Sequence, residues 1–379
     1  MKKIILIILI MLITISPFCF NAYADDTYNN QMNSFYEESG ADSLMGVLPD
    51  DVNETVNSYF DGFSQYDVSS ALSFNRVINF LLTLVTASLK SEMPLLITII
   101  VTLIIGMIFE VLYESYVNKS LAGVSNIVQM TAIIIALSAS VTAAINITKD
   151  SIYQMSLFCN TLSPVVCTML TSGGEPAKAA VAGTSIMLAC QICSYIGASV
   201  VLPIVNMYFA VVICDSIVDN ANLKSFAEFI KKTLYMILLA LIIIFSGIMS
   251  LQTVLAGTAD TVLKRSIKFA VGGMIPIAGG PLGEAMETVF SCADAVGSTV
   301  GIFGIIVILF IITTPIVMVL SKYVIIKLAA FTSYAVSNSK ISGLLSSMTG
   351  IFGVLASLTM ASSIMLISSI SVTVILMKG

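Results

Sequence analysis

The sequence contains no histidine, and only 10% of its 379 residues are charged. Without histidine, catalytic triads that use an imidazole base and zinc sites with imidazole ligands are both excluded. A soluble domain of this length needs far more charge to cover its surface, whereas 57% of these residues are hydrophobic. The composition therefore indicates a membrane protein.

The usual sequence signatures of enzymes are also missing. There is no Walker loop, no G-x-S-x-G, no H-E-x-x-H and no G-x-G-x-x-G that enters a helix after a strand. The pair Cys190 and Cys193 forms a C-x-x-C inside a charge-free run, which favours apolar packing over redox or metal chemistry. We therefore expect no catalysis and no cofactor, and an energy-coupled task would need an external ATPase or an ion gradient.

The N-terminus has the layout of a secretory signal. Lys2 and Lys3 precede an apolar run over residues 4–20, and the small residues Ala22 and Ala24 follow it. This order predicts a signal peptide over residues 1–24 that is cleaved after Ala24, with an uncleaved anchor as the alternative. In either case the next segment lies on the non-cytoplasmic side.

That next segment, residues 25–92, is acidic. It carries eleven acidic residues against two basic ones, Arg76 and Lys90, which is a poor fit to nucleic acid or to an anionic lipid surface. Apolar residues recur in it at helical intervals, and it is short for an independent core. We expect a short helical extracytoplasmic arm.

The rest of the chain, residues 93–379, is divided by its charges. The runs without a charged residue are 93–109, 120–148, 151–174, 179–214, 233–259, 295–321 and 341–377. A spanning helix needs about 20 apolar residues, so these runs predict an all-α membrane protein, a polytopic helical bundle of about six to eight spans. The run 179–214 is too long for one span, and Pro203 is expected to break it into a hairpin.

The basic residues predict an orientation for these spans. With the acidic arm outside, residues 110–119 come to lie inside and Lys149 outside, and Lys178, Lys224 and Lys322 then fall inside. Basic residues at 264, 265 and 268 break this pattern. The side of residues 260–294 is therefore left open.

Residues 260–298 resist a plain spanning interpretation. Asp260, Lys264 and Lys268 are four apart and share one helix face. The helix-disfavouring residues that follow are Gly272, Gly273, Pro276, Gly279, Gly280 and Pro281. Beyond them, steps of three and four place on one stripe Glu284, Glu287, Ser291, Asp294 and Ser298. The pattern fits a re-entrant segment with a polar path, or an amphipathic hairpin whose acids are solvated.

A family resemblance runs along essentially the whole chain. It is carried by the order of signal peptide, acidic arm and polytopic region, together with stretches at 163–164, 172–174, 250–253, 259–260, 264–270, 275–277, 288–289 and 297–304. In these features the sequence resembles the stage III sporulation protein AE of endospore-forming bacteria. The glycines at 297 and 301 also form a G-x-x-x-G, which suits close helix packing or a homo-oligomer.

The resemblance implies a part in sporulation. Proteins of this family belong to the assembly that joins the mother cell to the forespore, and they lie in the mother-cell-derived outer forespore membrane. The expected partners are membrane lipid, other stage III operon proteins including a secretion-type ATPase and ring-forming proteins, and indirectly stage II sporulation protein Q. The resemblance implies a channel or export-platform subunit required for forespore development, and it carries over no catalytic residues. Two alternatives stay open: a stand-alone secondary transporter, with Glu284, Glu287 and Asp294 coupling to ions, and a non-conducting scaffold.

Overall fold

The computed structural model describes residues 74–116, 119–172, 174–218, 223–274, 307–308, 310–334 and 339–378. Throughout these residues the structure is helical apart from the short turn before Pro176 and the residue after α8. The predicted signal peptide, with Ala22 and Ala24, and residues 25–73 of the predicted arm lie outside the described residues, so both stay predictions, while residues 74–92 are part of a helix.

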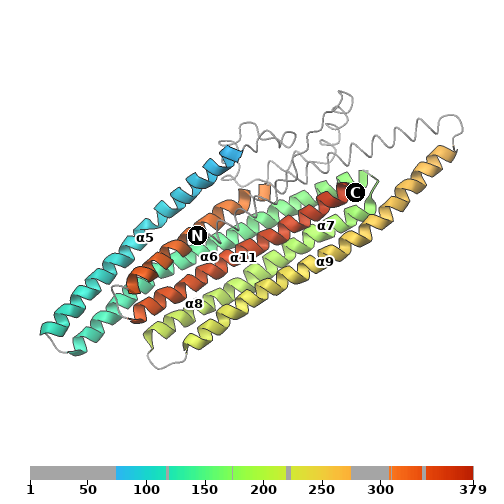
Figure 1. Ribbon diagram of the computed structural model, residues 1–379. Coiled ribbons are helices and arrows are strands. Elements are labelled where there is room, and N and C mark those ends of the chain that lie inside the picture. The colour runs from blue at the N-terminus through green and yellow to red at the C-terminus, as the bar shows by residue number, and fades with distance from the viewer. Residues whose placement is uncertain are drawn as a thin grey trace.

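The first two helices form a long antiparallel hairpin (Figure 1). Helix α5 covers Phe74–Tyr116 and α6 covers Lys119–Ser172. The Gln129 side-chain amide on α6 donates to the backbone oxygens of Thr102 (3.1 Å) and Leu103 (3.4 Å) on α5. Gly106 makes this contact possible, because a Cβ there would lie 2.1 Å from the Gln129 amide carbon. The expected border between residues 92 and 93 falls inside α5.

Helix α6 is one continuous helix of 54 residues, so the prediction of two separate spans meeting near Lys149 is wrong. Lys149 and Asp150 are exposed near its midpoint, and neither residue type terminates a helix. Pro164 also lies inside α6. The carbonyl of residue 160 is the one that the proline leaves without an N–H partner, because proline has no N–H to donate four residues back.

The next 42 residues form a second continuous rod, Pro176–Ile217. It is composed of α7 (Pro176–Gln191), the π-helical segment η3 (Ile192–Val201) and α8 (Leu202–Ile217). The expected hairpin at Pro203 is therefore wrong. The Leu202 N–H bonds to the Gly197 carbonyl five residues back, and this wider π turn lets the chain pass through Pro203 without reversing.

A tight turn joins α6 to α7. Gly174 has a φ of 76°, a left-handed conformation that glycine adopts without strain. Its N–H bonds to the Thr171 oxygen (3.0 Å), and the Glu175 N–H bonds to the Leu170 oxygen (2.9 Å), so the last carbonyls of α6 are satisfied. Pro176 then begins α7, where a missing N–H is harmless.

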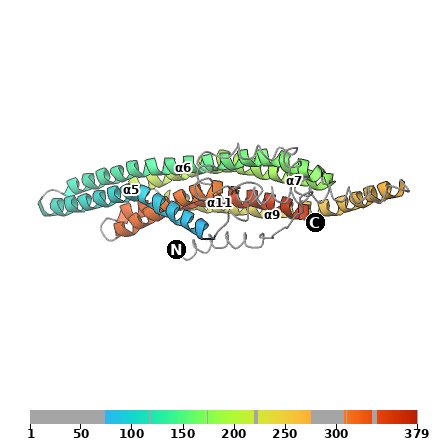
Figure 2. The same cartoon turned by 90° about the horizontal axis from the view of Figure 1, so that it is seen from above.

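The bundle is completed by α9 (Leu223–Met274), the helix Phe310–Tyr334 and α11 (Ser339–Lys378). Helix α11 packs against α6, α7, α8 and α9, and 72% of its most apolar stretch is buried, against 17% for α5. Six helices among the described residues are long and apolar enough to span a membrane, which confirms the predicted polytopic all-α bundle. The last part of α9 projects beyond the other helices in both views (Figure 1, Figure 2).

The helix ends that flank residues 117–118, 219–222 and 335–338 lie at the same end of the bundle, and the α6–α7 turn lies at the other (Figure 1). The sequence predicted residues 110–119, Lys224 and Lys322 on one side of the membrane, and this agrees with helix ends that lie together. Lys178 was predicted on that side too. It instead begins a rod that runs the length of the bundle before reaching the connection near Lys224, so this part of the predicted topology is wrong.

Candidate functional site

The structure describes only part of the segment singled out by sequence. Asp260, Lys264, Lys268, Gly272 and Gly273 lie in the C-terminal part of α9, which is helical through Met274, but their side chains are not described. The other residues of the predicted polar path lie outside the described residues: Pro276, Gly279, Gly280, Pro281, Glu284, Glu287 and Asp294. The path therefore stays a prediction.

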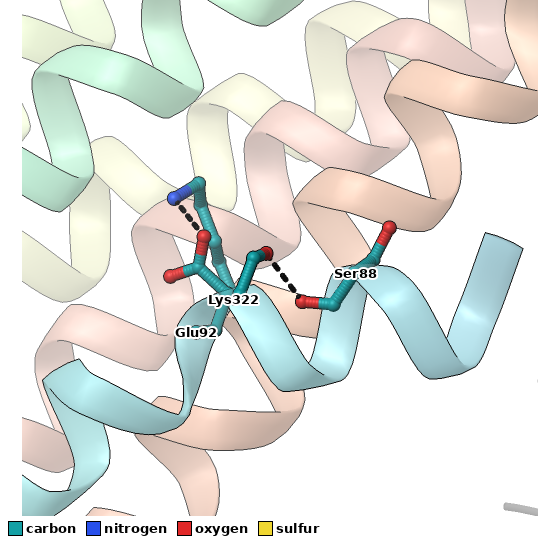
Figure 3. Close-up of polar contacts among 4 residues, drawn as sticks. Ser88, Glu92 and Lys322 are labelled. Carbon is teal, nitrogen blue, oxygen red and sulfur yellow. Dashed lines mark hydrogen bonds and ion pairs between the residues drawn. The ribbon is translucent and has the colours of Figure 1, made fainter.

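A buried ion pair joins α5 to the helix Phe310–Tyr334 (Figure 3). The Lys322 ammonium lies 2.5 Å from a Glu92 carboxylate oxygen, and the side chains are 8% and 16% exposed. Phe80 and Phe310 pack edge to face between the same two helices, with ring centroids 5.8 Å apart. The partners are 230 residues apart, so no local pattern in the sequence signals the pair.

A second buried pair lies at the α6–α7 turn. Lys178 donates to Glu175 at 2.9 Å, and both side chains are at most 5% exposed. Their spacing of three residues at a helix start is a signal that sequence reasoning could have used. Buried charges in an apolar bundle are tolerated when they are paired. In membrane proteins such ionisable residues often mark functional sites.

Contacts between helices show which residues share a level along the bundle. A Cβ on Gly197 would touch both Ile152 on α6 and Leu358 on α11, and Ser363 of α11 contacts Met155 of α6. The two helices thus run parallel in matching register. At 1.5 Å per residue, Asp150 and Gly353 lie within about 5 Å of one level.

Polar residues from four other helices gather at this level. A Cβ at Gly353 would lie 2.8 Å from the Tyr235 hydroxyl and 3.8 Å from the Tyr323 ring, and Gly350 faces Tyr208 and Lys231 in the same way. Tyr323 follows Lys322 directly. We call this level the polar belt, and its members are Glu92, Lys149, Asp150, Tyr208, Lys231, Tyr235, Lys322, Tyr323 and Lys327.

Along α6, the Pro176–Ile217 rod, α9 and α11, one side of the polar belt is free of charge over about a bilayer's depth. Residues 151–172, 179–207, 236–251 and 354–372 contain no charged side chain and all run toward the end that carries the α6–α7 turn. From Asp150 to Ser172, the last residue of α6 before the turn that carries Glu175, the rise is about 33 Å, close to the hydrocarbon core of about 30 Å. The polar belt and the Glu175–Lys178 pair therefore mark the two borders of an apolar slab.

Hydroxyl and thiol groups lie inside this slab, between α6, η3 and α11. The Ser156 and Ser194 hydroxyls are 2.7 Å apart, and the Cys193 thiol lies 3.7 Å from the Ser362 carbonyl. Cys190 and Cys193 are buried free thiols, and among the described residues no group of three or more histidine, cysteine or acidic side chains is placed to hold a metal ion. Small hydroxyl-bearing residues let helices approach closely, so this arrangement positions the central helix α11.

Comparisons with known proteins agree with one another. A family model described as stage III sporulation protein AE matches residues 56–377. The stage III sporulation protein AE of Bacillus subtilis (strain 168) is 26% identical over 286 residues, which cover 75% of this chain and 70% of that protein. No solved structure matches.

Proposed function

Because the chain belongs to the stage III sporulation protein AE family, we propose that it is the membrane subunit of a channel or export-like complex between mother cell and forespore. The observation that carries the proposal is the match of the family model to residues 56–377, which include all six candidate spans. The chain is a multi-pass, sporulation-specific membrane protein. Its task in forespore development would be conduction or assembly rather than catalysis.

The charge distribution supports an orientation within the mother-cell-derived outer forespore membrane. Lys149, Lys231 and Lys327 of the polar belt, with the nearby Lys224 and Lys232, concentrate positive charge at one border of the slab. Positively charged borders face the cytoplasm, so this end would face the mother cell and the acidic arm would face the intermembrane space. A secretion-type ATPase would then act at the lysine-rich end, while ring-forming proteins, and through them stage II sporulation protein Q, would meet the arm.

A deletion in an endospore-forming host tests the function. We expect vegetative growth to be unchanged, and expression of a late forespore reporter gene to be lost and restored by the wild-type chain. A stand-alone transporter predicts instead solute uptake by the purified protein in liposomes and no co-purification with the operon's ATPase. That result would contradict the proposal.

The predicted polar path through residues 260–298 needs its own variant. Replacing Glu284, Glu287 and Asp294 by alanine removes the ionisable groups, and we expect forespore reporter expression to be lost although the complex still assembles. The matched variant is Glu284→Gln, Glu287→Gln, Asp294→Asn, whose side chains still form hydrogen bonds but carry no charge. Comparing the two variants separates the contribution of charge from that of hydrogen bonding. Normal forespore development in the alanine variant would favour the scaffold.

A further inference from the structure

Two lysines of the polar belt differ from the buried, paired lysines of the bundle. Lys178 and Lys322 each have a carboxylate partner. Lys231 is half-buried on α9 and has no ion pair within the described part of the chain, although Glu228 lies only one turn away. Lys327 contacts the Tyr323 hydroxyl at 3.4 Å and the Tyr323 ring at 5.4 Å, again without a carboxylate.

Glycines on α11 bring these lysines and three tyrosines together. A Cβ at Gly350 would lie 2.6 Å from the Tyr208 hydroxyl and 3.2 Å from the Lys231 ammonium. A Cβ at Gly353 would lie 2.8 Å from the Tyr235 hydroxyl and 3.8 Å from the Tyr323 ring. The bare helix backbone thus admits hydroxyl and ammonium groups from α8, α9 and the helix Phe310–Tyr334. We call these five side chains, Tyr208, Lys231, Tyr235, Tyr323 and Lys327, the Tyr–Lys cluster.

The chemistry of the Tyr–Lys cluster calls for an anion rich in oxygen. It offers two ammonium groups and several phenol hydroxyls, and its own residues include no carboxylate, although the exposed Glu228 lies near Tyr208. Tyr208 already donates to the Ser347 carbonyl at 3.3 Å and Tyr235 bonds to Ser357, whereas the Tyr323 hydroxyl accepts from Lys327 and can still donate its own proton. A phosphate group presents several acceptor oxygens to such donors. At the border of the apolar slab, phosphate occurs in lipid headgroups.

Next to the Tyr–Lys cluster, on the slab side, α9 presents exposed apolar side chains that could contact the acyl chains of a lipid. On α9, Tyr235, Leu239 and Ile243 follow Lys231 at steps of four, so they continue one stripe of the helix into the slab. Leu239 and Ile243 are 61% and 62% exposed. We propose that the Tyr–Lys cluster binds the headgroup phosphate of an anionic phospholipid whose acyl chains lie along Leu239 and Ile243. This proposal does not depend on the function in sporulation.

Lipid selectivity of the purified full-length protein tests the proposal. Detergent-solubilised protein is titrated with phosphatidylglycerol or phosphatidylcholine, and retained lipid is counted by native mass spectrometry. We expect retention of phosphatidylglycerol over phosphatidylcholine, and a loss of about fivefold in affinity for each of Lys231→Gln and Lys327→Gln. Because Lys327 is exposed, Lys327→Gln alone still gives the result if Lys231→Gln disturbs folding.

The control is the double variant Lys224→Gln, Lys232→Gln, which removes two charges from exposed positions on α9, one more than either test variant. We expect it to stay within about twofold of wild type, because neither side chain belongs to the Tyr–Lys cluster. Equal losses in control and test variants would mean diffuse surface attraction and would overturn the proposal. Inorganic phosphate is a further arm: if it displaces phosphatidylglycerol at equal concentration, the site binds free anion and the lipid is ruled out.

Discussion

At the residue scale, the glycines of α11 differ in what surrounds them. At Gly350 and Gly353 a Cβ would lie within 3.2 Å of a hydroxyl or ammonium group, whereas a Cβ at Gly343 would meet nothing within 4 Å. All three lie in the same helix, so they share one helix propensity. Comparing them therefore separates the effect of close side-chain contacts at the polar belt from the effect of helix propensity.

Replacing Gly350 by alanine is expected to destabilise the protein by about 1–3 kcal/mol, because the methyl group would displace the buried Tyr208 ring and the Lys231 side chain. The control Gly343→Ala should be neutral or slightly stabilising, since alanine favours the helix. Thermal unfolding of the detergent-solubilised variants measures both. Equal midpoints for the two variants would mean that the close approach at Gly350 has no energetic consequence.

The Glu92–Lys322 pair gives a second prediction at this scale. Removing one partner, as in Glu92→Gln or Lys322→Met, leaves a buried charge and should cost about 3 kcal/mol, at the lower end of the usual range because Glu92 is 16% exposed. The double variant Glu92→Gln, Lys322→Met should recover most of this loss, since no charge is then left unpaired. Thermal unfolding in detergent again measures the change.

Lys90→Gln is the matched control for this pair, because Lys90 lies on the same helix with an exposed side chain. It should leave the unfolding midpoint unchanged. If the two single variants are additive in the double variant, the pair contributes nothing as a unit and its described geometry is not maintained in solution.

Sequence alone could predict charges but not their partners. The alternation of charged residues and long uncharged runs was enough for the spanning helices and their approximate number. It could not pair Glu92 with Lys322, because a contact across 230 residues depends on how the helices pack. Nor could it separate Gly350 from Gly343, since only the packed neighbours of α11 distinguish them.

At the element scale, two of the predicted interruptions do not occur. An uncharged run ends where a charge appears, but a helix ends only where its backbone hydrogen bonding ends, so α6 continues through Lys149 and Asp150. At Pro203 the preceding π segment moves the carbonyls away from the proline ring, and the helix continues. The charge and proline patterns therefore predicted the lengths of the apolar runs, but they also predicted breaks within α6 and within Pro176–Ile217 that do not exist.

A prediction for α6 follows from its exposed charges. Lys149 and Asp150 would be costly within hydrocarbon, so they should lie at the membrane border, while Leu157, also exposed, lies about 10 Å into the slab. In a variant without native cysteines, Asp150→Cys should react with a membrane-impermeant maleimide once cells are permeabilised. Leu157→Cys should stay unlabelled under both conditions. Labelling of both positions to the same extent would mean that the slab is not within a bilayer.

At the scale of the whole molecule, two polar levels about 33 Å apart enclose the apolar slab, and α11 lies at its centre. This geometry assigns sides to the helix ends. The helix ends that flank residues 117–118, 219–222 and 335–338 lie beyond the polar belt, and the α6–α7 turn lies at the opposite border of the slab. The excess of lysine near the polar belt favours the cytoplasm for that end.

The assignment of sides is tested by reporters that are active on one side of the membrane only. Inserted at residues 117–118, 219–222 or 335–338, a reporter should be on the cytoplasmic side, and at residue 173 it should be on the opposite side. The insertion at 173 is decisive, because the orientation predicted from basic residues alone put Lys178 on the cytoplasmic side. A cytoplasmic result there would require a reversal within α6 or within Pro176–Ile217. Either reversal would remove the matching register of α6 and α11, and with it the polar belt.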